Sequence, residues 1–345
     1  MSAGTHTAFA PAGLDIPTPR KVTSVSLLSK PTNGSFTLPR LLAVGAALAL
    51  TVGLSACAPA AGTSEDGAAA TDANAETVSF AKDDATLVFG VVPDTVDTQT
   101  NYQPLMDYIA EITGKEVEYH ESTDYAALIE AAVAGKIDVA SFSGFTYVTA
   151  TNNGAKITPF ASIITQEGEE PGYYSEAMVP EGSSITSIDG FKGKKVCFVD
   201  PSSTSGYLFP SYNLLEAGID PETDVTPVFA GKHDVSALKT SEGVECEAGF
   251  AEDSVAENQA GVKIIAKTKV PGAPMVVSDS LPAELKTTII EGLSNITITD
   301  IQDAGIKNAD SEGFINTFYA LAPVDDEYYD LIRDICEATN ATQCQ

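Results

Sequence analysis

The chain has 345 residues with 43% hydrophobic and 19% charged side chains, and its formal net charge is −29. The first 56 residues contain four basic side chains and one acidic side chain, so the rest of the chain carries −32. This charge argues against nucleic acid as a partner, because contacts between cations and phosphates dominate nucleic-acid affinity, and any small anionic ligand must be held by local donors.

The N-terminus is typical of an export signal. Residues 41–54 (LLAVGAALALTVGL) form an apolar run that follows Arg40. This run is too short for a spanning helix of about 20 residues, but it fits the core of a signal peptide. The sequence LSAC then resembles a bacterial lipobox, whose cysteine is diacylated and becomes the new N-terminus. We therefore expect residues 1–56 to be a lipoprotein signal peptide with a long extension, and Cys57 to anchor the exported protein on the outer face of the cell membrane. An ordinary secretory signal with an incidental Cys57 is the alternative.

Residues 57–83 are rich in Ala, Gly, Ser, Asp and Thr and contain almost no large apolar side chains. Such a segment cannot bury enough surface to offset the entropy of ordering, so it is expected to be a flexible tether. The folded part then begins near Asp84 and ends near Cys344, which leaves enough chain for two lobes with separate cores.

Four further cysteines, Cys197, Cys246, Cys336 and Cys344, suggest two disulfides in an oxidising compartment. Three pairings are possible. Cys197–Cys246 with Cys336–Cys344 is favoured, because each bridge then lies within one lobe or one terminus, and buried free thiols are the alternative. There is no C-x-x-C motif and no histidine cluster, so neither a metal site nor a cofactor is expected.

The pattern of apolar residues from residue 85 onward predicts alternating strands and helices. Strands are expected at 85–93, 115–121, 137–144 and 157–164, and helices at 100–114, 123–136 and 145–154. This order favours an α/β fold with a mostly parallel sheet between layers of helices.

Residues 172–193 are interpreted as a crossover to a second unit of the same kind. Strands are then predicted at 194–200, 224–231 and 244–253, with helices at 206–218 and 232–243; residues 261–282 lead back, and helices follow at 282–293 and 325–338. The expected first lobe is 84–170 with 265–345, and the second lobe is 171–264. In such a pair, ligands bind at the carboxyl ends of the strands, in the cleft between the lobes.

The stretch VDPSSTSGYLFP (199–210) places Ser203, Thr204, Ser205 and Gly206 between a predicted strand and a predicted helix. The first turn of a helix has unpaired N–H groups and a partial positive charge. Hydroxyl donors at that position, with Gly206 letting a ligand oxygen approach the backbone, therefore predict a site for an oxyanion that uses no charged side chain. Simple N-capping by one of the hydroxyls is the alternative.

Motifs spread over residues 85–295 resemble those of the phosphonate-, phosphite- and phosphate-binding proteins of ABC importers. They are FGVVP, NYQPLMDYIAEITG, TDYAALIEAAVAGKIDVASFSGFTYV, DGFKGKKVCFVDPSSTSGYLFPSY, AGKHDVSAL and EAGFAEDS. The resemblance implies a two-lobed type II periplasmic-binding-protein fold. It also implies a monomeric solute-binding lipoprotein that is not an enzyme and that delivers a phosphorus oxyanion to an ABC permease.

The resemblance also implies ligand contacts. Ser203, Thr204 and Ser205 correspond to donors to the phosphoryl oxygens, and His233 to a histidine that binds the same oxygens. Asp253 corresponds to an acid facing the cleft, which accepts a proton from the oxyanion or pairs with a substrate amine. Tyr125 corresponds to a tyrosine of the cleft, and the alternative is that it is a core aromatic residue. Ser143 is expected to add a donor and Phe145 to form part of the wall of the cleft. A further aromatic contact is expected from either Tyr173 or Tyr174.

One position departs from the family pattern. Binders of aminoalkylphosphonates carry a second acid in a proline-rich turn, where this chain has VPGAP (270–274) with Ala273. This departure weakens an assignment to 2-aminoethylphosphonate and leaves phosphite, phosphate and methylphosphonate open.

Other functions remain compatible with the sequence. One alternative keeps the fold and takes a sulfonate, nitrate or a thiamine-like cation as the ligand, and another is a receptor subunit that senses its ligand rather than delivering it for transport. A hydrolase with Ser203 or Ser205 as nucleophile and His233 as base is a less favoured alternative, because no G-x-S-x-G motif surrounds these residues.

Overall fold

The computed structural model of the chain describes residues 78–344. The expected signal peptide at 1–56, the lipidation site Cys57 and most of the expected tether at 57–83 lie outside the described residues. In the part of the chain that is described, no helix combines the length and apolarity needed to cross a membrane.

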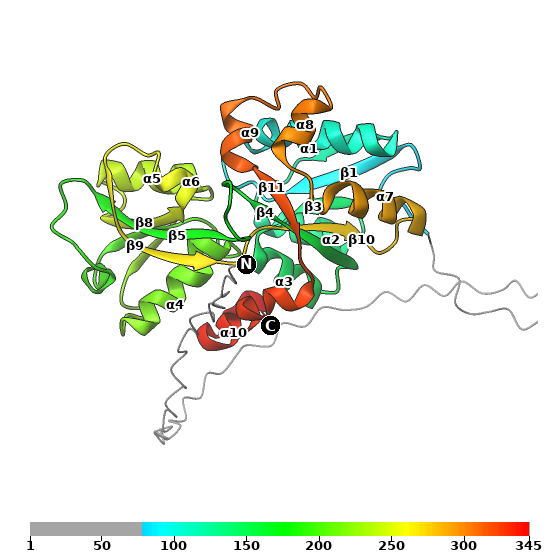
Figure 1. The fold of residues 1–345 in the computed structure, drawn as a ribbon. Coiled ribbons are helices and arrows are strands. Elements are labelled where there is room, and N and C mark those ends of the chain that lie inside the picture. The colour runs from blue at the N-terminus through cyan, green and yellow to red at the C-terminus, as the bar shows by residue number, and fades with distance from the viewer. Residues whose placement is uncertain (1–77, 345) are drawn as a thin grey trace, which may run out of the picture. The chain divides into compact units, whose positions relative to one another are not determined.

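The first lobe is built on a six-stranded sheet with the order β11-β4-β10-β3-β1-β2 (Figure 1). The strands are β1 (Thr86–Val91), β2 (Glu116–His120), β3 (Val139–Ser141), β4 (Ile157–Ile164), β10 (Pro274–Ser278) and β11 (Ala320–Pro323). Its helices are α1 (Thr98–Thr113), α2 (Tyr125–Val133), α3 (Gly144–Asn152), α7 (Ala283–Leu293), α8 (Ile298–Asp303) and α9 (Glu312–Thr317).

The second lobe is built on a five-stranded sheet with the order β7-β6-β8-β5-β9. The strands are β5 (Tyr173–Pro180), β6 (Lys195–Phe198), β7 (Thr226–Phe229), β8 (Ala248–Glu252) and β9 (Val262–Val270). The helical elements are η1 (Ile188–Phe191), η2 (Thr204–Leu208), α4 (Phe209–Glu216), α5 (His233–Glu242) and α6 (Asp253–Ala256). The C-terminal segment adds η3 (Asp326–Tyr329), α10 (Asp330–Thr339) and η4 (Thr342–Cys344).

Two sheets flanked by helices confirm the expected α/β class, but neither sheet is mostly parallel. Four strand pairings are parallel, and the five that involve β4, β5, β9, β10 or β11 are antiparallel within the described residues. The reason is that the strands on either side of the two crossings between the lobes, β4 and β5 and then β9 and β10, pair antiparallel with their neighbours. The crossover expected at 172–193 contains β5, which lies between β8 and β9 in the second sheet.

The boundaries of the lobes also differ from those expected. The Ser79 N–H donates to the Ser280 carbonyl at 2.8 Å and the Ala81 N–H donates to Asp138 Oδ1 at 3.0 Å, so the fold begins before residue 84. At the return crossing, β9 stays paired with β5 as far as Val270, so residues 265–270 belong to the second sheet rather than to the first lobe.

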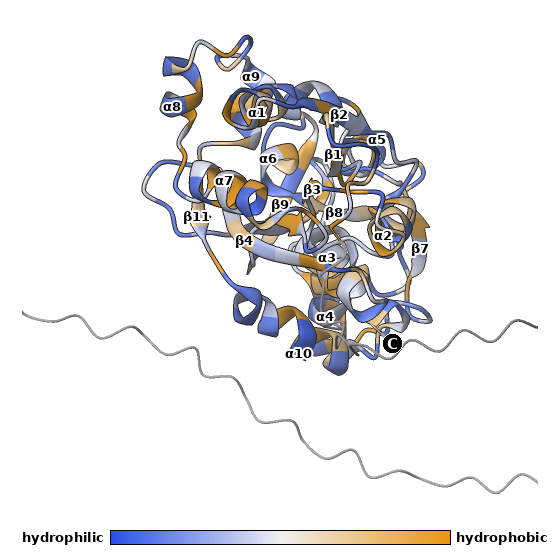
Figure 2. Cartoon of the chain, turned by 90° about the vertical axis from the view of Figure 1, so that its right-hand side faces the viewer, coloured by the Kyte–Doolittle hydropathy of each residue, from blue (hydrophilic) through white to orange (hydrophobic). Residues whose placement is uncertain are grey.

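The two lobes share a hydrophobic core on one side of the molecule. Side chains of α3 from the first lobe and of η2 and α4 from the second pack with Tyr329, Ile332 and Ile335 of the C-terminal segment. Helix α10 contacts α3, α4 and η2, and Figure 1 shows it below both lobes. Hydrophobic and hydrophilic residues alternate along α10 (Figure 2), as expected for a helix that buries one face.

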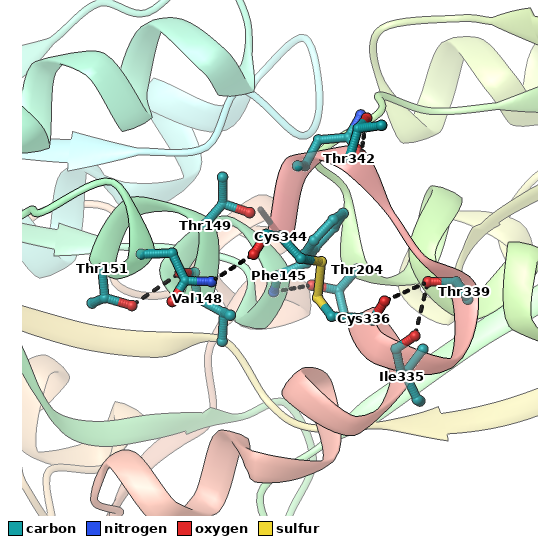
Figure 3. The surroundings of a disulfide bond; sticks show 12 residues. Phe145, Val148, Thr149, Thr151, Thr204, Ile335, Cys336, Thr339, Thr342 and Cys344 are labelled. Atoms are coloured by element: carbon teal, nitrogen blue, oxygen red, sulfur yellow. Dashed lines mark hydrogen bonds between the residues drawn. A yellow bond between two sulfur atoms is a disulfide. The ribbon is translucent and has the colours of Figure 1, made fainter.

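Both favoured disulfides are present. Cys197–Cys246 joins β6 to the segment before β8 with a Cα–Cα distance of 5.5 Å, and Cys336–Cys344 closes the C-terminal turn at 5.9 Å. Figure 3 shows the second bridge close to the hydrogen bond between Phe145 and Thr204. The side-chain amide of Asn152 donates to the Cys344 carbonyl at 3.1 Å, so the bridged turn is tied to α3.

The two bridges should differ in their contribution to stability, because they close loops of different length. The paired cysteines are 49 residues apart in Cys197–Cys246 and 8 apart in Cys336–Cys344. Replacing both cysteines of a bridge by alanine should lower the free energy of unfolding by about 4 kcal/mol for the first and about 2.5 kcal/mol for the second, from loop-closure entropy. Urea unfolding followed by circular dichroism measures both losses. A larger loss for the C-terminal pair would contradict this ranking.

Candidate functional site

A cavity of about 290 Å³ lies between the two lobes. The first lobe contributes the loop between β1 and α1 and the ends of β3 and β4 to its wall. The second lobe contributes the start of β5, the start of α5 and the junction of β8 with α6. The cavity therefore lies at the carboxyl ends of β1, β3 and β8, where α/β sheets bind ligands.

Several helices begin at this cavity. The wall includes Thr98 of α1, Tyr125 of α2, the α3 cap Ser143, His233 of α5 and Asp253 of α6, each at the N-terminus of its helix. Unpaired N–H groups and the helix dipole make such ends favourable for negative charge. No lysine or arginine is among the described residues that line the cavity.

Four of the predicted contacts line the cavity together: Tyr125, Ser143, His233 and Asp253. Tyr125 is 1% exposed, and burial raises the pKa of its hydroxyl well above the usual value, so the hydroxyl stays protonated and is available as a donor. Ser143 caps α3, and its hydroxyl lies 2.7 Å from that of Thr146. The structure also distinguishes the two neighbouring tyrosines, because Tyr173 lines the cavity and Tyr174 does not.

The imidazole of His233 is neutral and has a defined orientation. Its Nδ1 accepts a hydrogen bond from the Glu252 N–H at 2.9 Å, so the ring proton resides on Nε2. Burial lowers the pKa of His233 to about 4, against the opposing effect of nearby carboxylates, of which Asp94 is the strongest. His233 therefore remains a neutral N–H donor throughout the physiological pH range.

Two half-buried carboxyl groups that sequence reasoning missed, Asp94 and Glu252, face the same cavity. Burial raises the pKa of Asp94 to about 6, and repulsion from Glu252 adds to this effect while a hydrogen bond from Thr98 (2.5 Å) opposes it. Burial raises the pKa of Glu252 to about 7. Both acids follow the apolar core of a strand, at its carboxyl end, and that position is the signal that could have identified them.

The expected shortage of acids is not found in this cavity. Ala273 does line it, as the departure from the family pattern suggested. However, Asp94, Glu252 and Asp253 lie in the wall together with two further carboxylates, Asp97 and Asp234. The argument from Ala273 against a ligand that carries an amine therefore loses its basis.

Ser203, Thr204, Ser205 and Phe145 do not line the cavity, and each is at most 1% exposed. The Ser203 hydroxyl accepts from the Gly206 N–H at 3.0 Å, which is the simple capping role left open by the sequence. The Thr204 hydroxyl accepts from the Phe145 N–H at 2.8 Å, across the two lobes. The Phe145 side chain belongs to the shared hydrophobic core rather than to the wall of the cavity.

Ser205 lies directly behind the wall of the cavity. Its hydroxyl is fully buried without a well-formed hydrogen bond. The hydroxyl of Tyr173 lies near Ser205 and Thr204, whose hydroxyls lower the pKa of Tyr173 while burial, the larger effect, raises it. Since Tyr173 also lines the cavity, its side chain connects the cavity wall to the hydroxyl turn (residues 203–206).

Gly206 is required for packing inside the turn. A Cβ atom at this position would lie 2.4 Å from the Val199 side chain and 2.9 Å from Ser203 Oγ. The Leu208 N–H donates to the Ser203 carbonyl at 3.0 Å, which makes η2 a single wide helical turn. The glycine thus allows the turn to fold tightly against the end of β6, whereas the sequence had suggested that it admits a ligand oxygen.

Neither Ser203 nor Ser205 hydrogen-bonds to His233 in the described part of the chain. The Nδ1 atom of His233, which would accept a proton from a nucleophile, is already occupied by the Glu252 N–H. The residues of the hydrolase alternative are therefore not arranged as a nucleophile and its base.

Comparisons with known proteins agree with the geometry. Residues 89–320 match the family described as "ABC transporter, phosphonate, periplasmic substrate-binding protein". The phosphate-import protein PhnD of Mycolicibacterium smegmatis is 34% identical over 289 residues, which cover 75% of this chain and 88% of that protein. The phosphonates-binding periplasmic protein of Escherichia coli is 25% identical over 225 residues, covering 61% of this chain and 65% of that protein.

Among solved structures, PhnD1 of Prochlorococcus marinus in complex with methylphosphonate has a TM-score of 0.64 and 19% identity, covering 74% of this chain and 99% of that chain. A binding protein component of an ABC phosphonate transporter from Pseudomonas aeruginosa also has a TM-score of 0.64, with 21% identity over 75% of this chain and 87% of that chain. These similarities show that the fold is shared.

The half-buried Glu252 should make the stability of the protein depend on pH. The pKa of this carboxyl group is about 7 in the folded state, against an ordinary value of 4.5. The folded state therefore binds a proton at Glu252 more tightly than the unfolded state does. The stability that this proton provides is present at low pH and is lost as the pH rises through 7. We expect the free energy of unfolding to fall by about 1 kcal/mol between pH 6.5 and 8.5, and Glu252→Gln to remove most of this loss. Urea unfolding at pH 6.5 and at pH 8.5 measures this change in the free energy of unfolding. The control is Glu216→Gln, on the exposed surface of α4. Equal pH dependence in both variants would refute a raised pKa at Glu252.

Proposed function

The chain belongs to the periplasmic substrate-binding proteins of phosphonate ABC transporters, and we propose that it captures a compact phosphorus oxyanion between its lobes and delivers it to a membrane permease. The family is a solute-binding transporter component that acts outside the cytoplasm and is not an enzyme. The ligand is a phosphonate, phosphite or phosphate. In support, one relative is named for phosphate import and one structural neighbour holds methylphosphonate.

The observation that carries this proposal is a cavity surrounded by neutral donors. The hydroxyls of Tyr125 and Tyr173 and the Nε2–H of His233 come from both lobes, and helix N-termini surround them. Neutral donors bind an oxyanion by short, directed contacts, whereas the negative field of the distant surface is screened by salt within about 10 Å. Specificity then follows from the directions of the donors rather than from net charge.

The carboxyl groups in the wall select the protonation state of the ligand. A group such as Glu252, with a pKa of about 7, is partly protonated near neutral pH and is then itself a donor. When ionised, Glu252 or Asp253 accepts a hydrogen bond from a P–OH group or from an amine on the substituent. A fully ionised oxyanion without a proton to donate is disfavoured.

The hydroxyl turn receives ligand oxygens when the lobes separate. Phe145 and Thr204 belong to different lobes, so opening breaks their hydrogen bond and exposes the Phe145 N–H and the Thr204 hydroxyl to the cleft. An oxyanion placed between them accepts from both. Closure is then driven by the greater number of contacts that the ligand makes in the closed form.

Delivery follows from the position of the protein at the membrane. The LSAC sequence supports a lipid anchor at Cys57, which holds the monomer close to its permease. The segment after it, rich in small and polar residues, lets the binding lobes reach the transporter.

Replacing Tyr125 by phenylalanine should weaken binding by about tenfold or more, because one hydrogen bond to a charged ligand is lost while the buried ring is kept. Isothermal titration calorimetry of the full chain with phosphate, phosphite, methylphosphonate and sulfate measures the affinities. Tyr108→Phe, on α1 away from the cavity, is the control. The proposal fails if the unmodified protein binds none of the three phosphorus oxyanions more tightly than sulfate.

Ser205→Ala tests the hydroxyl turn separately. Because the Ser205 hydroxyl is buried without a well-formed hydrogen bond, its removal should leave the free energy of unfolding unchanged or slightly higher. Affinity for the best of the four ligands should still fall by about tenfold. Ser211→Ala removes another buried hydroxyl of this kind, on α4 behind the turn, and should leave binding intact. Unchanged affinity in Ser205→Ala would exclude this hydroxyl from the site.

A further inference from the structure

Four hydrogen bonds connect the loop between β1 and α1 (residues 92–97) to the start of α5. Lys232 Nζ donates to the carbonyls of Pro93 at 3.1 Å and Thr95 at 3.0 Å. The His233 N–H donates to the Asp94 carbonyl at 2.8 Å, and the Val96 N–H donates to Asp234 Oδ2 at 3.1 Å. No other short stretch of the described chain makes as many hydrogen bonds to the opposite lobe.

Every one of these bonds joins a group of the first lobe to a group of the second. The loop follows β1 of the first sheet, and α5 follows β7 of the second. The bonds therefore form only when the lobes are closed on this side of the cavity. Because the ammonium group supplies two of them, Lys232 makes the largest contribution.

The loop held by Lys232 forms part of the cavity wall. Asp94, Thr95 and Val96 of this loop line the cavity, whereas Lys232 does not. Inside the loop, the Thr95 N–H donates to Thr98 Oγ1 at 3.0 Å, and Thr98 Oγ1 donates to Asp94 Oδ1 at 2.5 Å. A lysine fixed on the Thr95 carbonyl therefore also fixes the direction of the Asp94 carboxyl group.

We propose that Lys232 is a positioning residue. Its hydrogen bonds to the 92–97 loop, here called the latch, hold the loop against the start of α5. They thereby keep the lobes closed over the cavity and orient Asp94 toward the ligand. The consequence for ligand binding rests on the proposed function. The latch itself is a property of the two lobes and can be measured without any ligand.

Lys232 acts through the loop rather than as an anion ligand. Its ammonium protons are directed at two carbonyl oxygens, which matches the hydrogen-bonding preference of a compact cation with no acceptor of its own. A flexible lysine stem also suits a contact that must form and break as the lobes move.

The first experiment measures the latch by hydrogen–deuterium exchange of the full chain without added ligand. Lys232→Met keeps the length of the side chain and removes the donors. In this variant the amides of Val96 and His233 should exchange at least about tenfold faster, because closure loses two charge-assisted hydrogen bonds. Lys232→Arg, which can still donate to both carbonyls, should restore most of the protection.

Lys239→Met is the matched control. Lys239 lies within α5, the helix that Lys232 precedes, carries the same charge and is paired with Glu245 at 2.7 Å. This variant should leave the exchange of Val96 and His233 unchanged, which separates the latch from a general effect of losing one positive charge.

The second experiment measures the dissociation of methylphosphonate and of inorganic phosphate by stopped flow. Lys232→Met should release the bound ligand at least about tenfold faster, with an association rate that is unchanged or higher, because the ligand enters the open form. Lys232→Arg should dissociate at nearly the unmodified rate, and Lys239→Met at the unmodified rate.

The outcomes separate this inference from the assignment of the ligand. If Lys232→Met exchanges like the unmodified protein at Val96 and His233, the latch is refuted, whatever the protein binds. If exchange accelerates but neither ligand binds the unmodified protein, the latch stands and the proposed ligand class is wrong. If exchange accelerates and the ligand still dissociates at the unmodified rate, Lys232 closes the lobes without holding the ligand, and its role in positioning Asp94 is refuted.

Discussion

An anion entering this molecule meets a chain of net charge −29 and a cavity with five carboxyl groups in its wall. Donors within hydrogen-bond distance must hold the anion, because the distant negative charges of the protein repel it. Salt reduces this repulsion by screening those charges. Tyr125, Tyr173 and His233 are the donors that we propose for this role, and burial keeps all three neutral. The same burial raises the pKa of Asp94 and Glu252, so the acids that oppose an anion are themselves partly neutralised.

The topology explains why these groups meet. In each lobe, parallel strands connected by helices direct the carboxyl ends of the strands and the N-termini of the helices to one edge of the sheet. The chain enters the second sheet at β5 and returns to the first at β10, both antiparallel to their neighbours, and the two edges meet at the cavity. The shared core beneath α10 holds the lobes against each other on one side, and the hydrogen bonds of Lys232 to the 92–97 loop join them on the other.

The sequence predicted the family, the two lobes, both disulfides and four of the residues in the wall, because each rests on a local pattern or a motif. It did not predict Asp94 and Glu252, since a single acid after a strand has no distinctive spacing and only the three-dimensional cavity brings them together. It also missed β5, where the alternation of apolar residues is interrupted by Glu176, a buried side chain whose charge is balanced by Lys267 of β9 at 2.7 Å. The hydroxyl turn was located correctly, but its partners depend on the closed lobes, which no local pattern encodes.

On both sides of the cavity, the lobes are joined by hydrogen bonds between a side chain of the second lobe and backbone groups of the first. On one side a Thr204 hydroxyl of the second lobe accepts from the Phe145 N–H of the first, and on the other side Lys232 of the second lobe donates to carbonyls of the first. In the open form all of these groups bond to water, so closing exchanges hydrogen bonds with water for hydrogen bonds within the protein, at a net gain of only about 1 kcal/mol each. Open and closed forms are then close in free energy, and even a small oxyanion makes enough differential contact to decide between them. A cavity of neutral donors, closed by bonds that are individually weak, is thereby able both to retain a small oxyanion and to release it.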